Sequence, residues 1–281
     1  MAYVYVHGGV SGRNRDRDPD LTPAVAAGLS AGTALDMIVA SVQVLEDDPA
    51  LNAGFGSVLT SNGELELDAG IADGPTGSFG AVIGVTVEHP IALARRVLDD
   101  TPHVVLVGAG AEALDPRARR VEIAPAQLER WRTAKERGHL EPTRFGLPDA
   151  VDTVGAVALD DEGRVAAGSS TGGVFGKMPG RVGDSPICGA GTYASPEVAV
   201  VGTGIGELFI ETLASARTAR LVEDGMHPQE ACEQVIAFIQ KRQEAEAGLL
   251  ALDADGRFGT AYRGASLPLA GPDGPIAPIH I

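Results

Sequence analysis

The sequence is poor in positive charge and in aromatic residues. Its formal net charge is −16 at pH 7, with 38 acidic residues against 22 basic ones. Binding to nucleic acid requires clustered Lys and Arg that neutralise phosphates, so a nucleic-acid partner is not expected. Aromatic residues make up 4% of the chain, which predicts a core built from Val, Ala, Leu and Ile.

Cysteines and long apolar runs are also scarce. Cys188 and Cys232 stand in different segments and form neither a metal-type nor a redox-type pair, so a reducing cytoplasm is the expected compartment. The apolar stretch Met1–His7 is too short for a signal peptide or a membrane span. No membrane partner is therefore expected.

The remaining composition, 44% hydrophobic and 21% charged over 281 residues, supports a substantial core. Helices are predicted from Thr22, as N-cap, to about Leu45 and from Glu207 to Asp224. Between about 115 and 149 the chain is punctuated by proline and holds little that could enter a core. This stretch is predicted to be a surface linker.

A turn sequence, Asp160–Gly163, separates two apolar runs that are predicted to pair as an antiparallel hairpin. Thr153 and Thr171 each stand nine residues from the glutamate of this turn. Folding about the turn would therefore bring the two threonines together at the open end of the hairpin. A second hairpin, with its turn at Ser195–Pro196, would carry Thr203 to a similar strand end.

A threonine hydroxyl is a weak nucleophile and needs a neighbouring base. If a cut before Thr153 makes it the first residue of a chain, its own α-amine becomes that base, with a reference pKa of about 7.7–8.0. An exposed linker ahead of Thr153 suits such a cut. On composition alone, the more frequent explanation is an ordinary threonine that begins a strand.

A series of short motifs occurs in a fixed order along the chain. The first half contributes His7–Gly9, Asn52–Ser57, Leu67–Ala69 and Asp73–Gly74. The second half contributes Asp152–Asp160, Ser170–Gly173, Lys177–Pro186 and Gly189–Ala194. From about residue 5 to residue 240 this string resembles the plant-type asparaginase and isoaspartyl peptidase family, and the whole string is far more specific than any single motif.

The resemblance implies an α+β fold, a four-layer αββα sandwich of the N-terminal-nucleophile hydrolase type. It implies one domain, 1–281, that cuts itself into 1–152 and 153–281. The implied activity is hydrolysis of the side-chain amide of L-asparagine or of β-aspartyl (isoaspartyl) peptides, so the substrate is a small molecule or short peptide. No organic cofactor is implied, and the assembly would be a homo-oligomer of two α and two β chains.

Matching positions imply catalytic roles for four residues. Thr153 would be the nucleophile, and Thr171 the hydroxyl that contacts and tunes it. The Thr203 hydroxyl and the Gly204 N–H would form the oxyanion hole, where each donor aimed at developing negative charge contributes roughly 3–4 kcal/mol. The alternative at 203–204 is a plain turn from strand to helix.

Four further positions match substrate-binding residues of the family. Arg181 would hold the substrate α-carboxylate, which suits the planar fork of a guanidinium, and Asp184 would hold the α-ammonium. Gly206 would line the same site, and Asn52 would lie near the nucleophile and order its loop. A surface salt bridge is the alternative for the charged pair, and an Asx-turn is the alternative for the asparagine.

The resemblance also implies a structural sodium ion held by backbone carbonyls, which leave no side-chain signature. The matching positions are Leu45, Glu46, Asp48, Leu51, Ala53 and Phe55.

One departure from the family concerns Asp152, because most asparaginase-type members carry Gly before the nucleophile. Asp at this place resembles glycosylasparaginases and threonine aspartases, so an amidase that acts on sugar-linked asparagine is the main alternative. An uncleaved relative acting as a scaffold or binder is a further one. We also expect Asp152 to assist self-cleavage, since a neighbouring carboxylate could accept the hydroxyl proton of Thr153.

A different class of protein is suggested by Val104–Ala113, where a strand is followed by G-x-G-x-x-A, as in dinucleotide-binding turns. The context argues against an NAD-binding protein. Asp115–Pro116 interrupts the chain where the helix should continue, and the proline-rich stretch offers no second strand with an acidic end.

Overall fold

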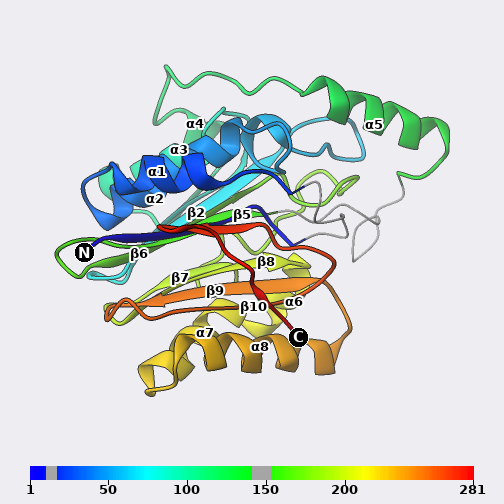
Figure 1. Cartoon of the computed structure of the whole chain (residues 1–281). Coiled ribbons are helices and arrows are strands. Elements are labelled where there is room, and N and C mark those ends of the chain that lie inside the picture. Colours follow the sequence, from blue (N-terminus) through cyan, green and yellow to red (C-terminus); the bar gives the residue numbers. More distant parts are fainter. Residues whose placement is uncertain (11–17, 141–152) are drawn as a thin grey trace.

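The computed structural model describes residues 1–10, 18–140 and 153–281. These residues form two β-sheets with helices on the outer face of each (Figure 1). The helices are α1 (Thr22–Leu29), α2 (Ala34–Asp47), the 3-10 helix η2 (Gly54–Gly56), α3 (Pro90–Asp100), α4 (Gly108–Glu112), α5 (Pro125–Glu136), α6 (Gly206–Thr212), α7 (Ala214–Glu223) and α8 (Pro228–Arg242). None of these described helices is long and apolar enough to cross a bilayer.

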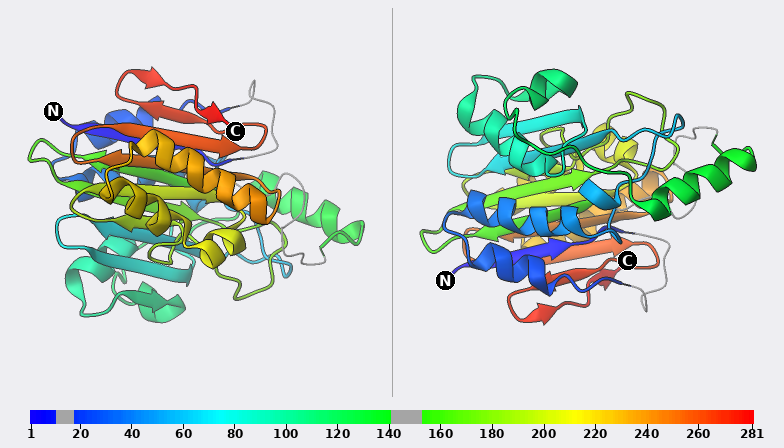
Figure 2. Two further views of the ribbon diagram at one scale, coloured as in Figure 1. Left: turned by 90° about the horizontal axis from the view of Figure 1, so that it is seen from below. Right: turned by 90° about the horizontal axis from the view of Figure 1, so that it is seen from above.

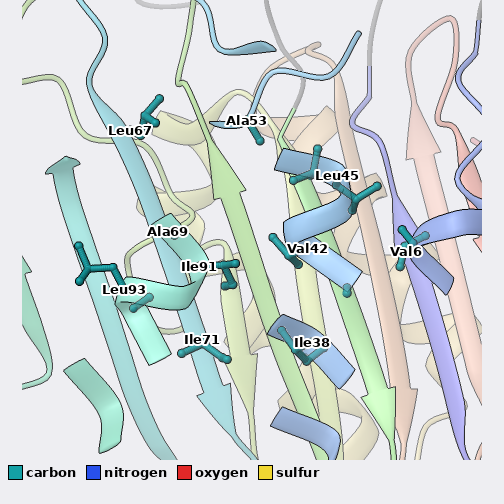
Figure 3. Packing of buried hydrophobic residues seen from close by; sticks show 14 of the residues in the cluster. Val6, Ile38, Val42, Leu45, Ala53, Leu67, Ala69, Ile71, Ile91 and Leu93 are labelled. Atoms are coloured by element: carbon teal, nitrogen blue, oxygen red, sulfur yellow. The ribbon is translucent and has the colours of Figure 1, made fainter. Parts of the chain in front are cut away.

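The larger sheet has eight strands in the order β12-β11-β1-β5-β6-β2-β3-β4. Their bounds are β1 (Tyr3–His7), β2 (Leu67–Asp73), β3 (Ser78–Val85), β4 (Val105–Val107), β5 (Val154–Leu159), β6 (Val165–Thr171), β11 (Leu269–Gly271) and β12 (Gly274–Pro275). Helix α2 packs on β5 and β6, and α3 packs on β2 and β3. Figure 3 shows Ile38, Val42 and Leu45 of α2 directed at this sheet, at a spacing that places them on one helix face.

The smaller sheet has five strands in the order β13-β10-β9-β8-β7. Their bounds are β7 (Thr192–Ala194), β8 (Val198–Gly204), β9 (Ala247–Asp253), β10 (Phe258–Arg263) and β13 (Ile279–His280). Helices α7 and α8 cover its outer face, and its inner face packs on β5 and β6 of the larger sheet (Figures 1 and 2). The predicted α+β class is confirmed.

The turn between β5 and β6 is fixed by the buried carboxylate of Asp160. It accepts hydrogen bonds from the backbone N–H groups of Glu162 and Arg164, both at 3.0 Å, and from that of Ala34 at 3.1 Å. The Arg164 guanidinium donates a further bond at 2.7 Å. From this turn the two strands pair without a register shift to Val154 and Ser170. The hairpin predicted from the sequence is therefore present.

Two helices that the sequence predicts as continuous are interrupted. The first divides into α1 and α2, and α1 has Leu21 as its N-cap instead of Thr22. Helix α2 starts with its own capping box, in which Thr33 and Asp36 bond each other's backbone N–H groups. The second divides into α6 and α7 at Leu213, whose φ of 48° lies in the left-handed region. A capping box begins a new helix at Thr33, and a left-handed residue ends the helix at Leu213.

The stretch predicted as a linker is in part attached to the body of the molecule. The Val121 N–H donates to the Thr86 carbonyl at 2.9 Å, Arg120 pairs with Val87, and Val121 and Ala124 are buried. Helix α5 follows and lies at one end of the molecule in every view (Figures 1 and 2). The rest of the predicted linker, 141–149, lies outside the described residues.

Candidate active site

Several strand ends meet at one end of the larger sheet, where β5 begins and β1 and β6 end. Thr153 directly precedes β5, and Thr171 closes β6. The two side chains are buried, and the Thr153 hydroxyl donates to the Thr171 hydroxyl with Oγ1 atoms 3.2 Å apart. The hydroxyl pair expected from the spacing in the sequence is present.

The turn that follows β6 is held against the Thr171 side chain. The Gly173 N–H donates to the Thr171 hydroxyl at 2.9 Å, and the Gly173 carbonyl accepts from the Asn52 amide at 2.6 Å. The side-chain oxygen of Asn52 accepts a hydrogen bond from the Val58 N–H at 2.9 Å. Asn52 therefore joins two loops beside the threonines, and its side chain does not form the Asx-turn considered above.

Thr203 and Gly204 end β8, on the sheet that faces the threonine pair. The Thr203 side chain is fully buried, and its hydroxyl accepts a hydrogen bond from the Val10 N–H at 3.2 Å. Val10 follows β1, which neighbours β5, so this bond joins the two sheets at the end where Thr153 lies. Gly204 has a φ of 141° and its Cα faces the Ala247 backbone, where a Cβ would come within 2.9 Å of the Ala247 Cα.

Arg181 and Asp184 flank Gly206, the first residue of α6. A Cβ on Gly206 would lie 3.0 Å from Arg181 Nη2 and 2.9 Å from Asp184 Oδ1, so the missing side chain leaves space between a cation and a carboxyl group. Arg181 also forms a bidentate ion pair with Glu207, at 2.9 and 2.8 Å. The structure thus places three predicted binding residues together. It adds Glu207, whose only sequence signal was its place next to Gly206.

The Asp184 side chain carries a strongly perturbed carboxyl group. Burial raises its pKa from 3.8 to about 7, with Arg181 lowering it and the charges of Glu207 and Asp68 raising it further. Its Oδ2 atom has no hydrogen-bond partner among the described residues. A buried carboxyl group with an unused acceptor is costly on its own and suits a cationic ligand.

The residues implied to hold sodium lie at the end of α2 and in the loop through η2. Backbone oxygens of this loop lie close to two glycines. A Cβ on Gly56 would lie 2.8 Å from the Asp48 carbonyl oxygen and also against that of Leu51, and a Cβ on Gly54 would meet that of Glu46. Three of the six implied carbonyl oxygens thus gather in this loop, and oxygen is the ligand type that a hard cation prefers. Among the described residues, no group of three acidic, His or Cys side chains could hold a metal.

The sequence also singled out two other features. Asp152 lies outside the described residues. The segment that suggested a dinucleotide turn forms β4, at the edge of the larger sheet, and the five-residue α4. A dinucleotide-binding unit would require a full helix after a central strand.

Fold and site together define an α+β protein with a buried threonine pair at the end of a sheet. The family model described as Asparaginase matches residues 12–270, and the chain belongs to the asparaginase family. It is 43% identical to the isoaspartyl peptidase of Salmonella typhimurium, over 83% of this chain and 79% of that protein. It is 41% identical to the plant-type L-asparaginase of Pyrobaculum calidifontis, over 93% and 94%.

A mammalian relative has a similar degree of likeness. The isoaspartyl peptidase/L-asparaginase of Mus musculus is 38% identical, over 86% of this chain and 76% of that protein. The family predicted from the ordered motifs is therefore confirmed.

Proposed function

We propose that this chain is a self-processing threonine hydrolase that cleaves the side-chain amide of L-asparagine, β-aspartyl peptides, or both. The observation that carries the proposal is the 3.2 Å contact between the Thr153 and Thr171 hydroxyls at the start of β5. The two helix layers around two facing sheets support an αββα sandwich of the N-terminal-nucleophile hydrolase type. The names of the relatives support the same substrates.

The first step makes the nucleophile. The Thr153 hydroxyl attacks the carbonyl carbon of residue 152, and its proton passes to a base. The peptide nitrogen takes up that proton as its bond to the carbonyl carbon breaks, which leaves an ester. Water hydrolyses the ester and frees the carboxyl group of residue 152. Thr153 then begins a new chain, and its α-amine is available as a base near neutral pH.

In turnover the α-amine of Thr153 accepts the proton of its own hydroxyl while the oxygen attacks the side-chain carbonyl of the substrate. The Thr203 hydroxyl and the Gly204 N–H donate to the oxyanion that develops. The leaving amine or ammonia takes the proton, and water hydrolyses the acyl ester to release aspartate. Arg181 binds the α-carboxylate and Asp184 the α-ammonium, which fixes the reacting carbon over the nucleophile.

A sodium ion at the end of α2 would serve this site indirectly. Backbone carbonyls of Leu45, Glu46, Asp48, Leu51, Ala53 and Phe55 would hold it. This loop also carries Asn52, which hydrogen-bonds to Gly173. The ion would thus stabilise the loop that supports Thr171, without touching substrate.

Intact mass measured under denaturing conditions tests the proposal. We expect two chains, 1–152 and 153–281, together with ammonia release from asparagine and hydrolysis of a β-aspartyl dipeptide. A single uncut chain that is nevertheless active would contradict the N-terminal-nucleophile mechanism. Exclusive activity on sugar-linked asparagine would instead support the glycosylasparaginase-like alternative.

A further inference from the structure

Helix α5 is the last described helix ahead of Thr153, and it is docked on loops next to the active site. The Trp131 ring packs on Gly63, where a Cβ would come within 2.8 Å of the indole. The Gln127 amide donates to the Gly56 carbonyl at 2.9 Å. The Arg130 guanidinium lies 4.2 Å from the centre of the Phe175 ring, a cation–π contact.

These contacts enclose a small apolar cluster beside the main core, and Trp131 packs against both. Val58 and Phe175 are buried in it, and Trp131, Ala134 and Leu140 pack against them. No residue of α5 is itself fully buried. A lone helix of twelve residues is marginal in water, so these contacts are what hold α5 in place.

The cluster is directly connected to the threonine pair. The Val58 N–H donates to the Asn52 side chain, and Phe175 lies two residues beyond Gly173. Asn52 and Gly173 are hydrogen-bonded to each other, and the Gly173 N–H donates to the Thr171 hydroxyl. Helix α5 thus covers the outer side of the two loops that orient Thr171.

We propose that α5 is a positioning element of the active site that stays docked after self-cleavage, with Trp131 as its anchor. The proposal rests on the proposed function, because only a cut before Thr153 assigns α5 and Phe175 to different chains. The contact between Arg130 and Phe175 then joins the two chains across the cut. The stretch ahead of the cut therefore acts in turnover as well as in processing.

Trp131 is the only tryptophan in the sequence, so intrinsic fluorescence reports on α5 directly. In protein whose two chains have been verified by mass, we expect a blue-shifted emission maximum and weak quenching by acrylamide. Both should match those of uncut Thr153→Ala protein. If the cut protein instead shows the emission and quenching of the urea-unfolded chain, α5 has been released and the proposal is overturned. If no cut occurs, the proposed function fails, whereas docking is still measured on the uncut chain.

Kinetics of Trp131→Ala test whether docking orients the nucleophile. We expect kcat to fall about tenfold with little change in KM, because a displaced catalytic group affects rate, whereas substrate binding through Arg181 and Asp184 should persist. Arg132→Ala, on the exposed face of the same helix, is the matched control and should match wild type. Trp131→Phe keeps an aromatic anchor and should restore most of kcat.

The route through Asn52 is tested by a double-mutant cycle. If α5 acts by holding the Asn52–Gly173 bond, Trp131→Ala should cost much less in an Asn52→Ala background. Wild-type kcat in Trp131→Ala, in protein with normal two-chain mass, would overturn the positioning role. Equal losses in both backgrounds would also overturn it as stated, because the effect would then not pass through Asn52.

Discussion

The two halves of the active site are built in different ways. The nucleophile side, Thr153 with Thr171, consists of uncharged hydroxyls placed by the register of β5 and β6. The substrate-binding side, Arg181 with Asp184 and Glu207, consists of charged groups on a loop and on the first turn of α6. Backbone geometry therefore positions the hydroxyls of the first half, whereas charged side chains make up the second. The two should respond to different perturbations.

Removal of the nucleophile gives the largest expected effect. Thr153→Ala has no hydroxyl for self-cleavage or turnover, so we expect one chain of 28.8 kDa and a loss of activity of at least about 10⁴-fold. Intact mass and ammonia release measure the two outcomes separately. Thr153→Ser keeps a hydroxyl and should still mature. Activity in uncleaved Thr153→Ala would place the nucleophile elsewhere.

Arg181→Lys alters the charged half alone. The ammonium keeps the charge but cannot form the planar fork that now pairs with Glu207. We expect normal maturation and a fall in kcat/KM for asparagine of about tenfold to a hundredfold, mostly through KM. A substrate with its α-carboxylate blocked as an amide serves as the control, since its kinetics should change little. An equal loss on both substrates would mean that Arg181 supports the fold instead of binding the carboxylate.

Acidification should weaken substrate binding through Asp184. Its pKa of about 7 means that the carboxylate needed for the α-ammonium is lost as pH falls through neutrality. The dissociation constant of the product, L-aspartate, should therefore rise about tenfold per pH unit below that value. We choose product binding because a binding constant does not depend on the Thr153 amine acting as a base in turnover. A pH-independent constant between pH 5 and 8 would contradict the assignment.

The same group has the opposite effect on stability. Because the folded-state pKa of Asp184 is raised above 3.8 to about 7, protonation favours the folded state, and this stabilisation is lost as pH rises through about 7. Asp184→Asn should therefore raise Tm more at pH 8 than at pH 5, while weakening aspartate binding at both. If Asp184→Asn stabilises the fold and weakens binding, the charge on Asp184 contributes to substrate binding and not to folding.

Asp152→Asn should affect processing without affecting turnover. If the carboxylate accepts the Thr153 hydroxyl proton, cleavage should slow by about 10²-fold, while the matured fraction keeps normal activity per free Thr153. Time-resolved mass spectra give the rate. Wild-type cleavage would refute the assisting role. Normal cleavage with poor turnover would place the new carboxyl terminus in the substrate site.

Sodium should have the smallest effect. Replacement of NaCl by choline chloride removes an ion that would bind only the folded loop, so we expect Tm to fall by about 2 °C. Thermal unfolding at equal ionic strength measures this. Gly56→Ala places a Cβ against the Asp48 and Leu51 carbonyls and should abolish the difference between the two salts. Equal Tm values for wild type in both salts would argue against the site.

The sequence predicted the nucleophile side better than the rest of the molecule. Thr153 and Thr171 are equidistant from a recognisable turn, and strand pairing is a regular function of residue number. The order of the motifs also identified the family. Charged contacts such as that of Arg181 with Glu207 depend on where a loop packs against a helix. No periodic pattern in the sequence predicts that packing.

The docking of α5 was not predictable for a related reason. The charged face of the helix and the prolines around it are typical of a surface linker. Its anchor, Trp131, packs on Gly63. This glycine is far away in the sequence, and no sequence pattern predicts that the helix contacts it. The breaks at Thr33 and Leu213 likewise depend on local backbone geometry inside apolar runs.

The turn held by Asp160 constrains how this chain can evolve. It lies about six residues, or roughly 20 Å, from Thr171 along β6, at the far end of the hairpin. Surface turns usually tolerate insertions and deletions. Here one added residue would shift the pairing of β6 by one position, so that Thr171 would no longer lie opposite Thr153. The side chains of β6 would also turn to the other face of the sheet. Length variation should therefore be far rarer at 160–164 than in other exposed turns of the protein, and Asp160, which never touches substrate, should be among the slowest positions to change.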